Sequence, residues 1–170
     1  MSSINTHTFS VIVDNQSGVL SRVVGMFAAR GYNIESLTVA EVDEDKNLSR
    51  ITVMITGTAM VIEQIKAQLE RIVPVRKVVD LNKEGAFVNR ELVLVKVKAK
   101  GVRRIESLRI ADIFRARVID SSNQSFVFEL TGTAEKLDAF IKLMNPLGLV
   151  EVSRTGAVAI LRGEKALFKE

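Results

Sequence analysis

The segment Asp14–Arg22 (Asp-Asn-Gln-Ser-Gly-Val-Leu-Ser-Arg) gathers the side chains best suited to binding a small charged molecule. Asn15 can both donate and accept hydrogen bonds, and Gly18 lets a ligand approach the backbone closely. The segment joins a strand-like run to a helical pattern, so the backbone N–H groups of a helix N-terminus point out of it. Such a terminus favours a carboxylate. The competing interpretation is simple capping of the helix by Asn15 or Ser17.

Elsewhere, the residue types that most enzymes use are scarce. The chain has no cysteine, which excludes disulfides, thiolate nucleophiles and cysteine-ligated metals. His7 is the only histidine, which argues against a histidine-built metal site or a Ser–His–Asp triad. The acidic turn Asp43–Asp45 lacks the spacing of a calcium loop. We therefore expect no catalytic residues, no metal and no cofactor on this chain.

The composition is that of a soluble globular protein of 170 residues, 47% hydrophobic and 26% charged. The longest uncharged apolar stretch, Ile51–Ile62, is too short to span a membrane. The N-terminus has no basic region followed by an apolar core, so a cytoplasmic location is expected.

Positive charge is concentrated in the second half of the chain. Residues 83–170 hold 16 Lys and Arg against 11 Asp and Glu, and the densest run lies within Lys96–Arg104. The basic half is either a solvated surface or a surface for nucleic acid or an acidic protein partner. No glycine-rich phosphate loop accompanies it.

An internal repeat organises the chain. Thr56–Ala59 (Thr-Gly-Thr-Ala) recurs as Thr131–Ala134, and each copy follows a strand-like run and precedes a helical stripe. Alternate apolar residues of the two runs correspond: Ile51, Val53 and Ile55 in the first, Phe126, Phe128 and Leu130 in the second. The same supersecondary unit is thus used twice.

Each half has the order β-α-β-β-α-β. In the first half we expect strands at 8–13, 33–42, 48–56 and 75–82, with helices at 18–30 and 59–72. In the second we expect strands at 91–98, 116–121, 125–131 and 149–153, with helices at 102–114 and 134–145. The predicted fold is α+β, with two tandem ferredoxin-like βαββαβ sandwiches. The predicted boundaries are 1–82 for the first domain, 83–90 for a linker and 91–170 for the second domain.

Both faces of the predicted sheets carry apolar side chains. Leu92–Val95 is a continuous apolar run, and Met54 lies opposite the face that Val53 occupies. A sheet buried on both sides needs a second layer or a partner. Self-association is therefore expected.

A nucleic-acid-binding protein is the competing class, since RNA-recognition modules share this element order. Neither Arg50–Gly57 nor Ser125–Gly132 carries the aromatic third-strand motif of those modules. Phe126 and Phe128 also occupy the core-facing register. We therefore expect no nucleic acid as a partner.

Two segments together identify a family. Asp14–Arg22 and Phe27–Ala40 (Phe-Ala-Ala-Arg-Gly-Tyr-Asn-Ile-Glu-Ser-Leu-Thr-Val-Ala) closely resemble the regulatory (small) subunit of acetolactate synthase, also called acetohydroxyacid synthase. Leu48–Thr52, Arg90–Lys96 and Gly132–Phe140 continue the match. The resemblance covers nearly the whole chain, and the loop with its glycine marks the first domain as an ACT domain.

The resemblance implies a non-catalytic chain. Its ACT domain would bind valine or another branched-chain amino acid and pair with a second ACT domain. Its C-terminal domain would help engage the catalytic (large) subunit, which would carry thiamine diphosphate, Mg²⁺ and FAD. The chain would activate that subunit and confer feedback inhibition in branched-chain amino acid biosynthesis. A free-standing amino-acid sensor is the alternative.

The resemblance also implies a site shared by two chains. Residues of the strand-to-helix loop of one chain would face residues at the start of the second strand of the other chain. The effector-binding residues carried over are Asn15, Ser17, Gly18, Val19 and Leu20 from one side, with Asn33 and Ile34 from the other.

Overall fold

The computed structural model describes residues 4–167. The chain divides into two compact units. Unit 1 contains residues up to Val88 together with the C-terminal segment from Ala157, and unit 2 contains Asn89–Gly156. Among the helices of residues 4–167, none combines the length and apolar character needed to cross a membrane.

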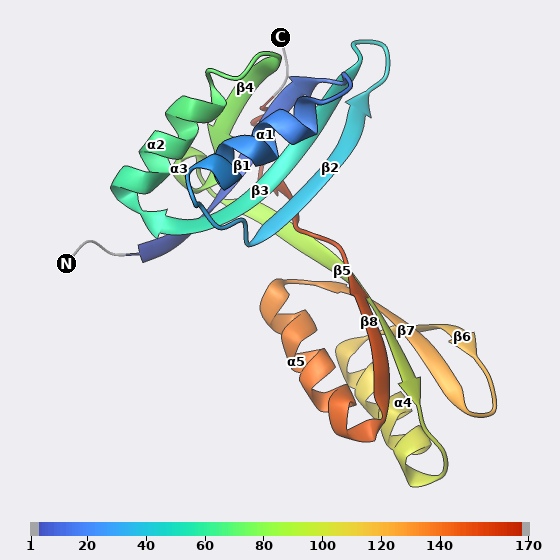
Figure 1. Ribbon diagram of the computed structural model, residues 1–170. Coiled ribbons are helices and arrows are strands. Elements are labelled where there is room, and N and C mark those ends of the chain that lie inside the picture. Colours follow the sequence, from blue (N-terminus) through green and yellow to red (C-terminus); the bar gives the residue numbers. More distant parts are fainter. Residues whose placement is uncertain (1–3, 168–170) are drawn as a thin grey trace. The chain divides into compact units, whose positions relative to one another are not determined.

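Unit 1 is a four-stranded antiparallel sheet with two helices on one face (Figure 1). Its strand order is β2-β3-β1-β4, which is the ferredoxin-like order predicted from the repeat. The elements are β1 (Ile4–Asp14), α1 (Val19–Ala29), β2 (Ser36–Asp43), β3 (Leu48–Thr58), α2 (Ala59–Leu69) and β4 (Val75–Asp80). Gly31, at φ 66°, follows α1 in the left-handed conformation that commonly ends a helix.

The core of unit 1 lies between this sheet and the two helices. Phe9, Val11 and Val13 alternate along β1 toward the helices, and all three are fully buried. Ile51, Val53 and Ile55 of β3 share that face. The predicted alternation thus sets which face of each strand meets the helices, and α1 packs on that face.

Unit 2 repeats the arrangement with the strand order β6-β7-β5-β8. Its elements are β5 (Phe87–Lys98), α4 (Val102–Phe114), β6 (Arg117–Ser121), β7 (Ser125–Gly132), α5 (Ala134–Met144) and β8 (Leu149–Arg154). Phe140 anchors the core, with its ring centroid 5.4 Å from that of Phe114 and 6.1 Å from that of Phe128. The fold class predicted from the sequence is confirmed in both units.

The segment expected to be a linker is instead ordered structure. Residues Leu81–Glu84 form the short helix α3, and β5 already begins at Phe87. Asp80 ends β4 because its carboxylate accepts a hydrogen bond from Asn82 N at 3.1 Å and so caps α3. The boundaries 1–82, 83–90 and 91–170 therefore differ from the observed division.

The last described residues belong to unit 1, although the sequence placed them in the second domain. The strand β9 (Val158–Leu161) pairs with the start of β5. Arg50 Nη2 donates to Ala159 O at 2.5 Å, and Lys77 Nζ donates to Leu167 O at 2.7 Å. We call residues 157–167 the C-terminal strap.

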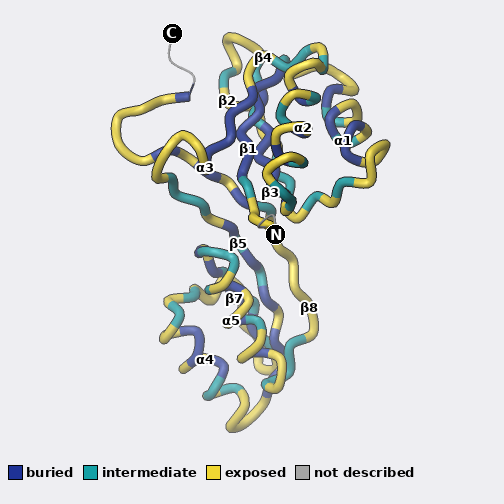
Figure 2. Tube along the Cα trace, turned by 90° about the vertical axis from the view of Figure 1, so that its left-hand side faces the viewer, coloured by how far each residue is buried: buried dark blue, intermediate teal, exposed yellow. Residues whose placement is uncertain are grey.

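The strap covers the sheet face of unit 1 that lacks helices. Ala159, Leu161 and Leu167 form an apolar cluster with Val79 and Leu81. The strand residues on this face are correspondingly buried, as the dark blue β1 trace shows (Figure 2). The sheet of unit 1 thus has a layer on both faces, and the strap supplies the second layer from the same chain.

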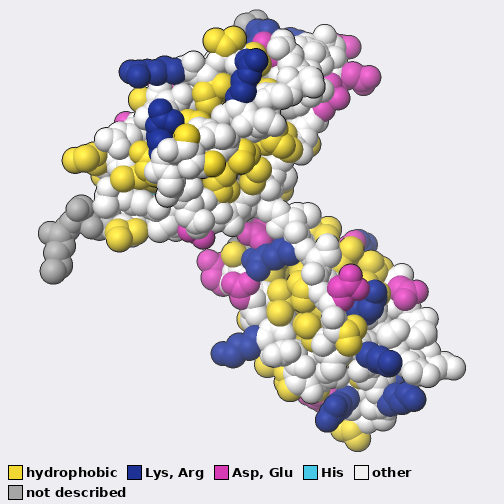
Figure 3. Space-filling view, viewed as in Figure 1, with side chains coloured by type: hydrophobic (Ala, Val, Ile, Leu, Met, Phe, Trp, Pro, Cys, Tyr) yellow, Lys and Arg dark blue, Asp and Glu magenta, His cyan; other side chains and the backbone are white. Residues whose placement is uncertain are grey.

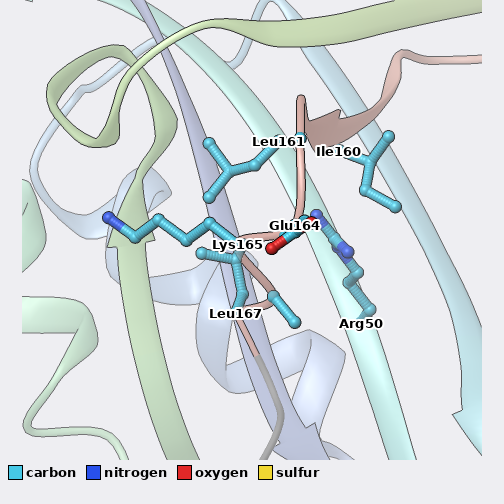
Figure 4. Close-up of a pocket in the computed structure, with 8 residues that line it drawn as sticks. Arg50, Ile160, Leu161, Glu164, Lys165 and Leu167 are labelled. Atoms are coloured by element: carbon cyan, nitrogen blue, oxygen red, sulfur yellow. The ribbon is translucent and has the colours of Figure 1, made fainter.

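The strap does not fill the space over the sheet completely. A pocket of about 310 Å³ remains between it and Arg50. Figure 4 shows Ile160, Leu161 and Leu167 lining this pocket from the strap, with Arg50 rising from β3. Burial lowers the pKa of the Arg50 guanidinium from its ordinary value.

Leu161 and Ile160 give a matched test of the strap. Leu161 is 7% exposed, whereas its neighbour Ile160 is 63% exposed. We expect Leu161→Ala to lower the free energy of unfolding by about 2–3 kcal/mol, because it removes a buried side chain. Ile160→Ala should change it by less than about 0.5 kcal/mol. Denaturant unfolding followed by circular dichroism measures both, and equal effects would contradict the assignment of the strap to the folded unit.

Candidate effector site

The loop between β1 and α1 is held from two sides. Asn15 N donates to Asn47 O at 2.8 Å, and Asn47 Nδ2 donates to Asn15 O at 3.2 Å. Arg76 on β4 pairs with the Asp14 carboxylate. The loop is therefore fixed at its base, while Asn15, Ser17 and Gly18 themselves stay exposed.

The helix α1 begins without a side-chain cap. Gly18 is its N-cap residue, at φ 84° and ψ −5°, and no side chain of the described residues caps the first turn. Capping by Asn15 or Ser17, the competing interpretation, is thus not what the structure has. Apart from Gly18 and its two neighbours in the chain, no heavy atom of the described residues lies within 4 Å of the position that a Cβ at residue 18 would occupy. Val19 N already donates to Gln16 O at 3.3 Å, and the remaining backbone N–H groups of the first turn lie beside open space, an arrangement suited to a carboxylate.

The three apolar residues predicted for the site differ in how far they are exposed. Val19 is 7% exposed and belongs to the core of unit 1. Leu20 and Ile34 are half-buried and pack against that core. Their remaining surface is available to a small aliphatic group.

Asn33 and Ile34 lie at the other end of α1 from the loop. The helix has 11 residues, and at 1.5 Å per residue its ends are about 16 Å apart. The sheet also separates the two groups along β3. Asp14 is in register with Leu48, where β3 begins, whereas Glu35 N donates to Met54 O, further along that strand, at 2.9 Å. Within one chain, the structure does not bring the two groups of predicted residues together.

The structure adds residues that the sequence did not indicate. Asn47 follows the acidic turn and adopts a positive φ of 51°, and it fixes the backbone of Asn15. Arg22 on α1 donates to Val73 O at 2.8 Å and so ties the helix to the loop before β4. An asparagine at the end of a short polar turn was the only local signal for Asn47.

The other singled-out residues have structural roles. His7 Nδ1 lies 2.8 Å from the buried Asp80 carboxylate, and Tyr32 packs against the core of unit 1. No group of three metal-ligating side chains occurs within residues 4–167. Phe126 and Phe128 are 4% and 0% exposed, so neither ring can stack on a base.

The chain is similar to known proteins over nearly its whole length. Residues 9–77 match the model of the AHAS small subunit-like ACT domain, and residues 90–163 match that of the small subunit of acetolactate synthase. The acetolactate synthase small subunit of Haemophilus influenzae is 48% identical, over 94% of this chain and 97% of that protein. A probable acetolactate synthase small subunit of Archaeoglobus fulgidus is 45% identical, over 94% and 98%.

A solved structure shows the same fold. The crystal structure of the acetolactate synthase small subunit from Thermotoga maritima matches with a TM-score of 0.85 and 36% identity, covering 95% of this chain and 99% of that one. Both the sequence matches and this structural match extend over almost the full length of the chain. The chain therefore belongs to the family of acetolactate synthase small subunits, and it is a regulatory, ACT-domain subunit rather than the catalytic chain.

Proposed function

We propose that this chain binds valine, or another branched-chain amino acid, and transmits feedback inhibition to the catalytic subunit of acetolactate synthase, which it also activates. The observation that carries the proposal is the uncapped N-terminus of α1, with Gly18 in the left-handed conformation and open space around it. Family membership places such a terminus in an ACT domain. The catalytic subunit would supply the chemistry with its thiamine diphosphate, Mg²⁺ and FAD.

The proposed binding mode divides the amino acid into two parts. The carboxylate meets the N–H groups of the first turn of α1, where the helix dipole also favours negative charge. The amides of Asn15 and Asn33 bind the polar atoms of the zwitterion. Val19, Leu20 and Ile34 contact the isopropyl group, which contributes about 1.5–3 kcal/mol if fully buried.

The same chemistry limits selectivity. Leucine and isoleucine differ from valine by one methylene group, and a hydrophobic pocket discriminates a methylene by only about 1–3 kcal/mol. Discrimination among the three amino acids therefore depends on how tightly the second chain closes the site.

A homodimer would bring the two parts of the site together. β2 is an edge strand of the unit 1 sheet, and its Val39 and Val42 are 42% and 53% exposed. Antiparallel pairing of two β2 edges would place the Ser36 end of one strand beside the Asp43 end of the other. Because the Asn15 loop lies at the Asp43 end, it would then approach Asn33 and Ile34 of the second chain.

Gly18→Asp tests the effector site. The introduced carboxylate would occupy the space meant for the ligand carboxylate and repel it, so we expect valine affinity to fall roughly 10- to 150-fold. Activation of a cognate catalytic subunit should persist near the wild-type level. The assay follows acetolactate formation against valine concentration, with the small subunit alone as a control that should show no turnover.

Asn15→Ala and Asn33→Ala are the matched variants, and each should weaken valine inhibition less than Gly18→Asp does. Unchanged valine sensitivity in folded Gly18→Asp would show that the effector binds elsewhere. Parallel loss of activation and inhibition would show that the loop serves the catalytic subunit instead. Co-purification with the catalytic subunit separates the proposal from a free-standing sensor.

The exposed β2 edge gives a test of the proposed homodimer. Sedimentation equilibrium at micromolar concentration should give at least twice the 18.8 kDa chain mass. Val39→Lys with Val42→Lys should shift the chain toward monomer, since edge lysines oppose strand pairing, and should weaken valine binding with it. Met60→Lys, at a position 72% exposed on α2, is the control. A wild-type monomer that binds valine fully would contradict the shared site.

A further inference from the structure

The outward face of α4 exposes four large aliphatic side chains that nothing in unit 2 covers, interspersed with the exposed charges of Arg109 and Asp112 and with the partly exposed Glu106. Val102, Ile105 and Ile113 are 82%, 55% and 76% exposed, and Leu108 is 36% exposed. The side chains that α4 buries against its own sheet, Ser107, Ile110 and Ala111, lie on the opposite side of the helix. Four large aliphatic side chains on the solvent side of one short helix mark a candidate contact surface.

The neighbouring helix α5 does not share this exposure of large aliphatic side chains, so the exposure is a property of α4 and not of the helical layer of unit 2. α5 packs beside α4 and buries Leu137, Phe140 and Met144. Its exposed side carries Glu135, Asp138, Ala139 and Lys142, and Leu143 is the one exposed large aliphatic side chain of this fully described helix. α5 is thus an ordinary amphipathic surface helix, and α4 is not.

Basic side chains lie at both ends of α4. Lys100 and Arg103 are exposed at its start and Arg115 just beyond its end. Lys98 and Arg117 are exposed on the other face of the sheet, where Arg117 pairs with Glu129. Arg104 lies against the Phe126 ring at 3.8 Å, so its position is fixed. Unit 2 holds 12 Lys and Arg against 8 Asp and Glu. Figure 3 shows basic side chains gathered at the end of unit 2 where β5 leads into α4.

We propose that the outward face of α4 is the docking surface for the catalytic subunit. The facing patch of the catalytic subunit would be apolar at its centre and acidic at its rim. The proposal rests on the proposed function, in which such a subunit is the partner. An apolar centre enclosed by a charged rim is the usual composition of a protein interface. The basic rim supplies long-range attraction to an acidic partner.

The charges disfavour a second copy of this chain as the occupant. An antiparallel pair of α4 helices would bring Lys100 and Arg103 of one helix beside Arg115 of the other. A parallel pair would bring Lys100 and Arg103 of both copies together. Each arrangement places like charges at the rim, whereas an acidic rim pairs with all of them.

Ile105→Asp combined with Ile113→Asp tests the surface. The full-length variant is titrated against the catalytic subunit, with binding measured by calorimetry and activation by acetolactate formation. We expect the affinity to fall about tenfold or more. Leu143→Asp is the matched control, since it places the same charge on the exposed side of α5, and it should bind within about twofold of wild type.

Two further variants keep the result interpretable. Val102→Asp places a carboxylate in the first turn of α4, where the helix dipole favours it, so weakened binding by this variant cannot come from loss of the helix. Lys100→Glu with Arg103→Glu should weaken binding at low salt and by a smaller factor at high salt. Stronger binding by this charge reversal would contradict the acidic rim.

The outcomes separate this proposal from the proposed function. If wild type neither binds nor activates the catalytic subunit, the proposed function fails, and the docking surface with it. If wild type binds and all the α4 variants bind equally well, the docking surface alone is wrong. A change in the mass of the free variant without a change in its binding would assign α4 to contacts between copies and overturn the proposal.

Discussion

The length of α1 is the constraint on which the effector site depends. The helix places the Asn15–Gly18 loop about 16 Å from Asn33 and Ile34. A valine molecule is far shorter than this distance, so one chain cannot enclose it with both groups of residues. The proposed shared site follows directly, and effector binding becomes linked to the pairing of two chains. An unpaired chain would present only an open helix terminus in water, where a single carboxylate contact contributes little.

The strap shows a second way in which distant parts of the chain complete a unit. In the sheet of unit 1, Thr8, Ser10 and Thr52 are buried on the face without helices, because the strap lies over that face. Two chain connections, at Val88–Asn89 and Gly156–Ala157, therefore join the units in sequence. Loss of residues 157–167 would therefore uncover the sheet of the effector unit, whereas unit 2 would keep all its residues.

Local patterns predicted most of the fold. The α4 bounds, Val102–Phe114, agree with the sequence prediction, because the strand, turn and helix signals around them are all local. β9 was missed because Val158 and Ile160 are exposed while Ala157, Ala159 and Leu161 are buried. All five side chains are apolar, so the alternation in burial leaves no alternation in polarity.

The candidate site was predictable in part. The loop and its glycine are recognisable in the sequence, since a polar strand-to-helix junction has a local signature. The hydrogen bonds of Asn47 to Asn15 join residues 32 positions apart, and only the β2–β3 hairpin register brings them together. The exposed aliphatic side chains of α4 could not be recognised from the sequence either. Aliphatic residues occur on both sides of this helix, so the sequence does not tell which side meets the sheet.

Mixed dimers test the shared effector site most directly. Gly18→Asp alters the loop of one chain, and Ile34→Asp alters the facing residue of the other, so neither homodimer should bind valine. After the two variants exchange subunits, each mixed dimer has one site built only from unaltered residues and one that carries both changes. We predict that calorimetry detects wild-type valine affinity at about a quarter of all sites in the equilibrated mixture. Complete exchange without recovery of valine binding would contradict a site formed by two chains.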